Sequence, residues 1–128
     1  MIIIGIDPAT YELGVGVVNV DKDGKINLLD VYHISTRKCK TMKARLEAIY
    51  NEMSEIIRKH KPDHVSIESQ YLAINPDAFR KICYSVGVIL AAVFLNSEAE
   101  ISTVEASRWR KVALGKGNAS KKEAVKQM

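Results

Sequence analysis

Two carboxylates that follow apolar segments are the residues of this sequence best placed to do chemistry. Asp7 ends the run at residues 1–6 and precedes Pro8, and Glu68 ends the shorter stretch at residues 64–67. A carboxylate at the end of a buried strand is costly unless a cation or hydrogen-bond donors compensate it. Asp7 is therefore either a metal ligand or a residue whose side chain accepts hydrogen bonds from the backbone of the following turn.

Basic residues gather in the last part of the chain. Residues 106–128 carry seven basic side chains and one acid, whereas residues 1–105 carry 12 basic and 14 acidic ones. The basic side chains are Arg108, Arg110, Lys111, Lys116, Lys121, Lys122 and Lys126. Glycines among the lysines near the start of a predicted helix indicate contact with a polyanion. The alternative is a solvated helix face that serves solubility.

Length and composition describe one globular domain. The chain has 128 residues, of which 47% are hydrophobic and 27% charged, values typical of an ordinary soluble domain with a single core. Cys39 and Cys83 are far apart in the sequence, which favours reduced thiols in the cytoplasm over a disulfide. The apolar stretch at residues 82–95 is shorter than the ~20 residues of a membrane-spanning helix, so we expect no membrane partner.

The elements that would position these residues begin with three strands. The run at residues 1–7 lacks polar alternation, which predicts a central strand buried on both faces. Residues 13–20 and 26–34 predict two further strands, joined by a turn with Asp-Gly at its centre. The chain therefore opens with an antiparallel meander.

Helices and strands then alternate. Apolar residues spaced three and four apart predict an amphipathic helix over residues 41–60 that ends before Pro62. The strand at residues 64–68 follows a helix, so a parallel crossover beside the first strand is expected. The later predicted elements are a helix at residues 76–95 capped by Asn75, a strand at 101–104, a short helix at 107–111 and a last helix opened by the capping box at 120–123.

The helix at residues 76–95 is apolar nearly all round from Ile82 onward. One amphipathic face packed on a sheet does not require this, so a second surface must cover the helix. A homodimer would supply that cover, and Phe79, Cys83, Val86 and Leu90 are the predicted contacts. The alternative is that this face packs on the sheet of the same chain.

The order of strands and helices resembles the ribonuclease H-like fold, and the residues resemble more closely the RuvC family of Holliday-junction resolvases. The matching segments are residues 5–8 with 14–18, 67–75 and 115–121, in the order of the family. The chain differs from the family at Ala9, where glycine is usual. It also lacks, up to Met128, the family's final helix with two further acids, so residues 1–128 are expected to be a single nuclease domain truncated at its C-terminus.

The resemblance implies an endonuclease that cuts four-way or branched DNA in recombination and repair, leaving 5′-phosphate and 3′-hydroxyl ends. It makes Asp7 and Glu68 joint ligands of Mg²⁺ or Mn²⁺, with two ions in each active site, and it implies a homodimer and a branch-migration helicase as partners. It also implies DNA contacts by Tyr71, Arg108, Arg110, Lys111, Lys116, Lys121 and Lys122. Ser120 would open a helix whose N-terminus favours phosphate. Residues 1–128 alone are expected to bind junctions but to cut them poorly.

Two functions other than a nuclease remain open. The first is a junction-binding protein that does not cut, which the absence of the second pair of acids supports. An actin-like ATP-binding module shares the first strands, but it needs two such domains to enclose a nucleotide. Junction binding without cutting would distinguish the binding protein, and stabilisation by ATP would distinguish the ATP-binding module.

Overall fold

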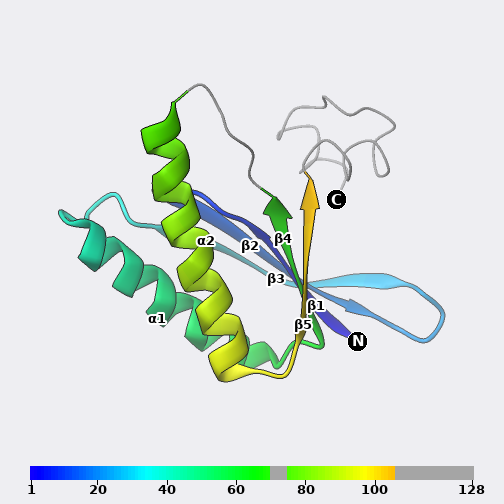
Figure 1. Ribbon diagram of the computed structural model, residues 1–128. Coiled ribbons are helices and arrows are strands. Elements are labelled where there is room, and N and C mark those ends of the chain that lie inside the picture. Colours follow the sequence, from blue (N-terminus) through cyan, green and yellow to red (C-terminus); the bar gives the residue numbers. More distant parts are fainter. Residues whose placement is uncertain (70–74, 106–128) are drawn as a thin grey trace.

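The computed structural model describes residues 1–69 and 75–105. Within them, two helices pack on one face of a five-stranded sheet, as Figure 1 shows. The elements are β1 (Ile2–Asp7), β2 (Glu12–Val20), β3 (Ile26–Ser35), α1 (Met42–His60), β4 (His64–Ser69), α2 (Pro76–Asn96) and β5 (Glu100–Glu105). Every strand and helix predicted within these residues is confirmed, with ends that differ by one residue or so. The short helix at 107–111 and the last helix lie outside the described residues.

The sheet has the order β3-β2-β1-β4-β5, so the first strand is central, as predicted. β1 pairs antiparallel with β2 and parallel with β4, and β4 pairs parallel with β5. Burial on both faces of β1 is not observed. Ile4 and Ile6 are buried toward the helices, but Ile3 is half-buried and Gly5 is exposed. An apolar run alone does not distinguish burial on one face from burial on two.

Side-chain caps explain where both helices begin, and a residue in the left-handed conformation explains where α1 ends. The Thr41 side chain accepts a hydrogen bond from the Ala44 N–H, and the Asn75 side chain accepts from Asp77 and Ala78. Such caps satisfy backbone donors that lack partners in the first turn. α1 ends at His60, and Lys61 after it adopts a left-handed conformation with φ 48° before Pro62.

The hydrophobic core lies between the sheet and the helices. Its sheet side is formed by alternate residues of β1, β2, β3 and β4, which face one way because side chains alternate along a strand. Its helix side comprises Ile49, Met53, Ile56 and Ile57 of α1 with Ile89, Ala92 and Val93 of α2. Asn96 ties the helices together, since its amide donates to Ser54 Oγ at 3.1 Å and to the Ala92 carbonyl at 2.7 Å.

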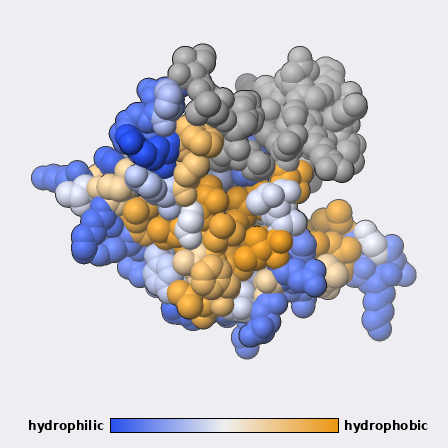
Figure 2. Space-filling model, in the orientation of Figure 1, coloured by the Kyte–Doolittle hydropathy of each residue, from blue (hydrophilic) through white to orange (hydrophobic). Residues whose placement is uncertain are grey.

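α2 has 21 residues, more than the apolar stretch at 82–95 suggested. Among the described residues it is a helix that is long enough and apolar enough to cross a membrane. Its position contradicts a membrane span, because Ile89, Ala92 and Val93 are fully buried in the core of the domain. Nevertheless, only 22% of its most apolar 18 residues are buried. Figure 2 shows hydrophobic side chains along the visible face of α2.

Cys39 and Cys83 are free thiols.

Candidate metal-dependent nuclease site

Asp7 and Glu68 meet at one end of the sheet. The parallel register pairs Ile6 with Ile67, so Asp7 and Glu68 are the next residues of adjacent strands, which lie about 4.8 Å apart. Both project from the face opposite the helices, because Ile6 and Ile67 beside them are buried in the core. Both are half-buried. The sheet therefore places two carboxylates side by side.

Glycine keeps the space beside Asp7 open. Gly14 is the antiparallel partner of Asp7, and a Cβ atom added to it would lie 3.9 Å from Asp7 Cβ. The next residue in that row is His33 of β3, whose side chain is 66% exposed. An approach to Asp7 from the β2 side is thus free of a side chain at position 14.

The loop that follows Asp7 is fastened to the end of β3. Thr36 is 1% exposed; its Oγ1 donates to the Thr10 carbonyl at 2.7 Å, and its N–H donates to the Tyr11 carbonyl at 2.9 Å. Ala9 causes no backbone strain, because its φ is not positive: within the described residues, Lys61 is the only non-glycine residue with a positive φ. The loop geometry therefore accommodates alanine where the resembling family has glycine.

Charged side chains surround Tyr11 in the same loop. The guanidinium of Arg45 lies 4.8 Å from the centre of the Tyr11 ring, and that of Arg37 lies 5.8 Å away, both within the range of cation–π attraction. Glu12 accepts a hydrogen bond from Arg37, and His33 Nε2 lies 2.6 Å from Glu12 Oε2. The hydrogen bond from Arg37, together with the charge of the same guanidinium and the nearby His33, lowers the pKa of Glu12 from its usual value.

The sequence did not lead us to this cluster, although it held a signal. Five basic residues fall between positions 37 and 45, and no acid occurs between Asp30 and Glu47. The net charge of residues 1–105 concealed this group, because acids elsewhere in that segment outnumber the bases. A count over a shorter span would have found it.

The residues present fit a hard divalent cation. Carboxylate oxygens without cysteine are ligands that Mg²⁺ and Mn²⁺ prefer, and Asp7 and Glu68 supply them from adjacent strands. No group of three or more histidine, cysteine or acidic side chains that could hold a metal occurs in residues 1–69 and 75–105. Asp77 contributes nothing here, since its carboxylate is engaged by Arg80 and Lys81; the hydrogen bond from Arg80 is the main cause of its lowered pKa.

Several predicted contacts lie outside the described residues. They are Tyr71, Arg108, Arg110, Lys111, Lys116, Ser120, Lys121 and Lys122. The predicted dimer contacts are described: Cys83 is exposed, and Phe79, Val86 and Leu90 are half-buried on α2. Leu90 also packs against the core.

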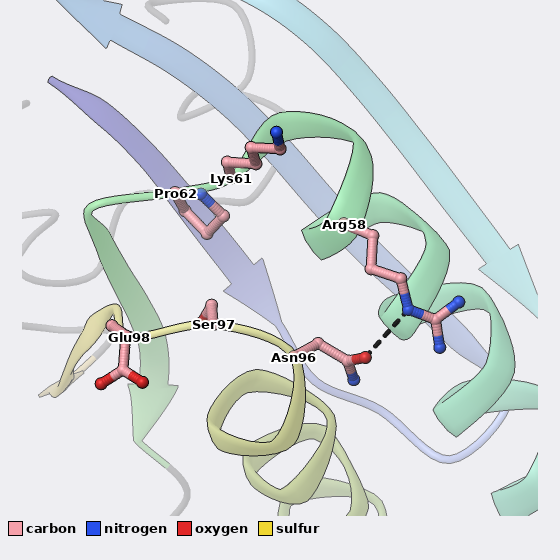
Figure 3. Close-up of a pocket in the computed structure, with 6 residues that line it drawn as sticks. All are labelled: Arg58, Lys61, Pro62, Asn96, Ser97 and Glu98. Carbon is pink, nitrogen blue, oxygen red and sulfur yellow. Dashed lines mark hydrogen bonds between the residues drawn. The ribbon is translucent and has the colours of Figure 1, made fainter.

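A depression of about 370 Å³ lies at the other end of the sheet. It is lined by Arg58, Lys61, Pro62, Asn96, Ser97 and Glu98, from the ends of α1 and α2 and the loops that follow them. Figure 3 shows Arg58 donating from Nε to Asn96 Oδ1 at 2.9 Å. These loops precede β4 and β5, whereas Asp7 and Glu68 follow strands, so this depression is separate from the carboxylate site.

The sheet begins with an antiparallel meander and continues with two parallel strands, and two acids lie side by side at one end of it. This arrangement defines a ribonuclease H-like domain. Residues 3–128 match the family model "Crossover junction endodeoxyribonuclease RuvC". The chain is 32% identical to the protein of that name from Anaplasma phagocytophilum, over 96% of this chain and 75% of the relative. The chain belongs to the RuvC family.

Solved structures agree with this assignment. Thermus thermophilus RuvC is 26% identical and superposes with a TM-score of 0.85, covering 99% of this chain and 77% of the other. A second structure shows T. thermophilus RuvC in complex with Holliday junction substrate; it shares the fold with a TM-score of 0.82 at 24% identity, over 89% of this chain and 72% of that one.

Proposed function

We propose that this chain is a structure-selective endonuclease that hydrolyses phosphodiester bonds at four-way DNA junctions, with divalent metal ions held by Asp7 and Glu68. The observation that carries the proposal is the placement of these carboxylates at the ends of adjacent parallel strands. Membership of the RuvC family supports it, as does the Holliday junction bound by the T. thermophilus protein. The same membership favours this activity over ATP binding.

The roles of the residues follow from their positions. Asp7 and Glu68 would hold Mg²⁺ or Mn²⁺, and two ions would supply an activated water and a stabilised leaving 3′ oxygen. The carboxylates orient that chemistry from rigid strands. Gly14 leaves room beside Asp7 for a DNA backbone, and the hydrogen bonds of Thr36 keep the loop after Asp7 in place.

The test uses isosteric substitutions in a protein that includes the C-terminal acids of the family. Asp7→Asn and Glu68→Gln should each abolish Mg²⁺-dependent cutting of a four-way junction, because each removes a metal ligand, while junction binding stays within about two-fold, since binding rests on basic residues. The matched controls are Asp23→Asn in the β2–β3 turn and Glu55→Gln on α1, both exposed. Retained cutting in either site variant, or loss of cutting in a control, contradicts the assignment. Binding without any cutting by the unmodified protein would identify a junction-binding protein instead.

The homodimer is part of this proposal, because two symmetric strands of a junction require two active sites. α2 supports it: Cys83, Gly87 and Phe94 lie opposite the buried side of the helix and are exposed. A Cβ atom added at Gly87 would meet nothing within 4 Å, so a second helix can approach closely there. Phe79, Val86 and Leu90 flank this surface as the predicted contacts, and the structure adds Phe94, which is 62% exposed.

Location and a further partner complete the proposal. The free thiols of Cys39 and Cys83 support a cytoplasmic location for this chain, because thiols stay reduced in the cytoplasm. A branch-migration helicase is the protein partner that the family resemblance implies, and co-purification with the assembled junction complex would test it.

A further inference from the structure

We infer that residues 37–45 form a second DNA-contact surface, which holds the backbone of the duplex arm beside the cleavage point. This inference rests on the proposed junction nuclease and assigns it a substrate contact in addition to the predicted C-terminal one. We call this surface the N-terminal basic surface. Its members are Arg37, Lys38, Lys40, Lys43 and Arg45.

Its position follows from the sheet. Asp7 pairs with Gly14, and Gly14 pairs with His33, so β3 ends at the same end of the sheet as Asp7. Two strand spacings separate Asp7 from His33, a distance of about 10 Å. Residues 37–45 follow His33 and the end of β3, so phosphates held by them should lie at least about three nucleotides from the cut, at about 3.4 Å each along one DNA strand.

The surface is attached to the loop that carries Asp7. Thr36, immediately before the segment, donates both of its hydrogen bonds to carbonyls of Thr10 and Tyr11. Arg45 at the other end of the segment packs over the Tyr11 ring. The segment is therefore held at both ends against the loop that follows Asp7, and its position relative to the site is set by these contacts.

The charges of the segment are arranged against local stability. A helix N-terminus carries a partial positive charge and favours acids in its first turn, yet the first turn of α1 has no acid and includes Lys43. The ion pair from Lys43 to Glu47 at i,i+4 has its lysine on the N-terminal side, which is the less favourable orientation. This placement is unfavourable for the helix but favourable for an anion, because both the helix end and the lysines attract it.

Part of the positive charge remains available to a ligand. Arg37 pairs with Glu12 and Lys43 with Glu47, whereas Lys38 and Lys40 are exposed and form no ion pair within the described residues. The Lys43 side chain is 83% exposed, so its ion pair lies at the surface where a phosphate can compete for it. A row of cations that reaches away from a phosphodiester-cleaving site fits a continuous polyanion, and the duplex arm that leaves the cut is that polyanion.

The test compares two triple variants that remove equal charge. Lys38→Gln, Lys40→Gln and Lys43→Gln together alter the surface; Lys22→Gln, Lys25→Gln and Lys59→Gln together are the control. In each set two lysines are exposed and one forms a surface ion pair, Lys43 with Glu47 and Lys59 with Asp30. Lys22 and Lys25 flank the β2–β3 turn, at the other end of the sheet from Asp7.

Binding of a labelled four-way junction is measured by fluorescence anisotropy without Mg²⁺ over a range of salt concentrations. Loss of up to three phosphate contacts should lower the slope of log K against log salt by about 2 to 3, and affinity at ~0.1 M salt should fall roughly ten-fold or more. The control set should leave the slope within about 0.5 of the unmodified value. Phosphate-ethylation interference should show the lost contacts at least about three nucleotides from the cut, on the duplex arm beside it.

Three outcomes would overturn the inference. Equal losses in both sets would mean that only total charge matters, and an unchanged slope in the surface variant would mean that no phosphate lies there. Lost contacts far from the cut would place the arm elsewhere. A failure of the unmodified protein to bind junctions would refute the proposed function itself, and is distinguishable because no variant is needed to observe it. If the triple variant loses its fold by circular dichroism, Lys40→Gln alone should lower the slope by about 1.

Discussion

Phe94 offers a quantitative test of the proposed dimer. It lies on the surface of α2 opposite the buried residues Ile89, Ala92 and Val93, and 62% of it is exposed. Phe94→Ala removes the whole ring from this surface while leaving the core of the protomer intact. The dimer should therefore weaken, and the folded protomer should keep nearly the same melting temperature.

The size of the effect can be worked out from the exposed area. A phenylalanine buries about 150 to 250 Å² when fully covered, so the exposed part of Phe94 offers roughly 125 Å² to a partner. At about 25 cal/mol per Å² this corresponds to about 3 kcal/mol in each protomer, and a twofold axis doubles it. Alanine retains part of the contact, and covering at an interface is incomplete. We therefore expect a loss of about 2 to 4 kcal/mol, or roughly 30- to 1000-fold in Kd.

The dimer is measured by sedimentation velocity at protein concentrations from about 1 to about 100 micromolar, a range over which such a change in Kd alters the dimer fraction. The unmodified protein should be dimeric, and Phe94→Ala should dissociate within this range. Leu28→Ala on β3 is the matched control, since Leu28 is 64% exposed but belongs to a different element. A monomeric unmodified protein would refute the dimer, and an unchanged Kd in Phe94→Ala would refute this surface of α2 as its interface.

Four further predictions concern stability, pH, base stacking and the activity of residues 1–128. Met53 is fully buried, so Met53→Ala should lower the free energy of unfolding by about 2 to 5 kcal/mol in urea titrations; a loss below 1 kcal/mol would contradict its place in the core. Glu12 has a pKa lowered from its usual value, chiefly by the hydrogen bond from Arg37, so its stabilising effect is present above that usual value and is lost as pH falls through the lowered pKa. Glu12→Gln should therefore lower the urea midpoint at pH 7, and the difference should shrink as the pH falls through the lowered pKa of Glu12; a difference that does not shrink in acid would be evidence against the ion pair. Tyr71→Ala should weaken junction cutting in line with a stacking energy of about 1 to 3 kcal/mol, with Tyr71→Phe nearly normal; unchanged junction processing would exclude stacking. A polypeptide of residues 1–128 should bind junctions in a salt-dependent manner yet cut them poorly, because a two-metal site needs more ligands than Asp7 and Glu68 provide, and robust Mg²⁺-dependent cutting would show that other acids are used.

Local signals in the sequence determined the elements and their ends. The Asp-Gly turn, the caps at Thr41 and Asn75 and the stop before Pro62 act over a few residues, so their physical effects can be read from neighbouring positions. The pairing of β1 with β4 also followed, because a helix between two strands favours a parallel crossover. Adjacent placement of Asp7 and Glu68 could thus be predicted from the order of elements.

Contacts between distant residues could be decided only by the tertiary structure. The burial of one face of β1 depends on where α1 and α2 pack, which an apolar run does not specify. The attachment of Thr36 to the loop after Asp7, and of Arg45 to Tyr11, joins residues more than 20 positions apart. Charges that cancel in the count over residues 1–105 are separated in space, because folding sets the distances over which charges act. The run of bases at residues 37–45 can be read from the sequence, but only the pairing of β1, β2 and β3 places it at the same end of the sheet as the carboxylates.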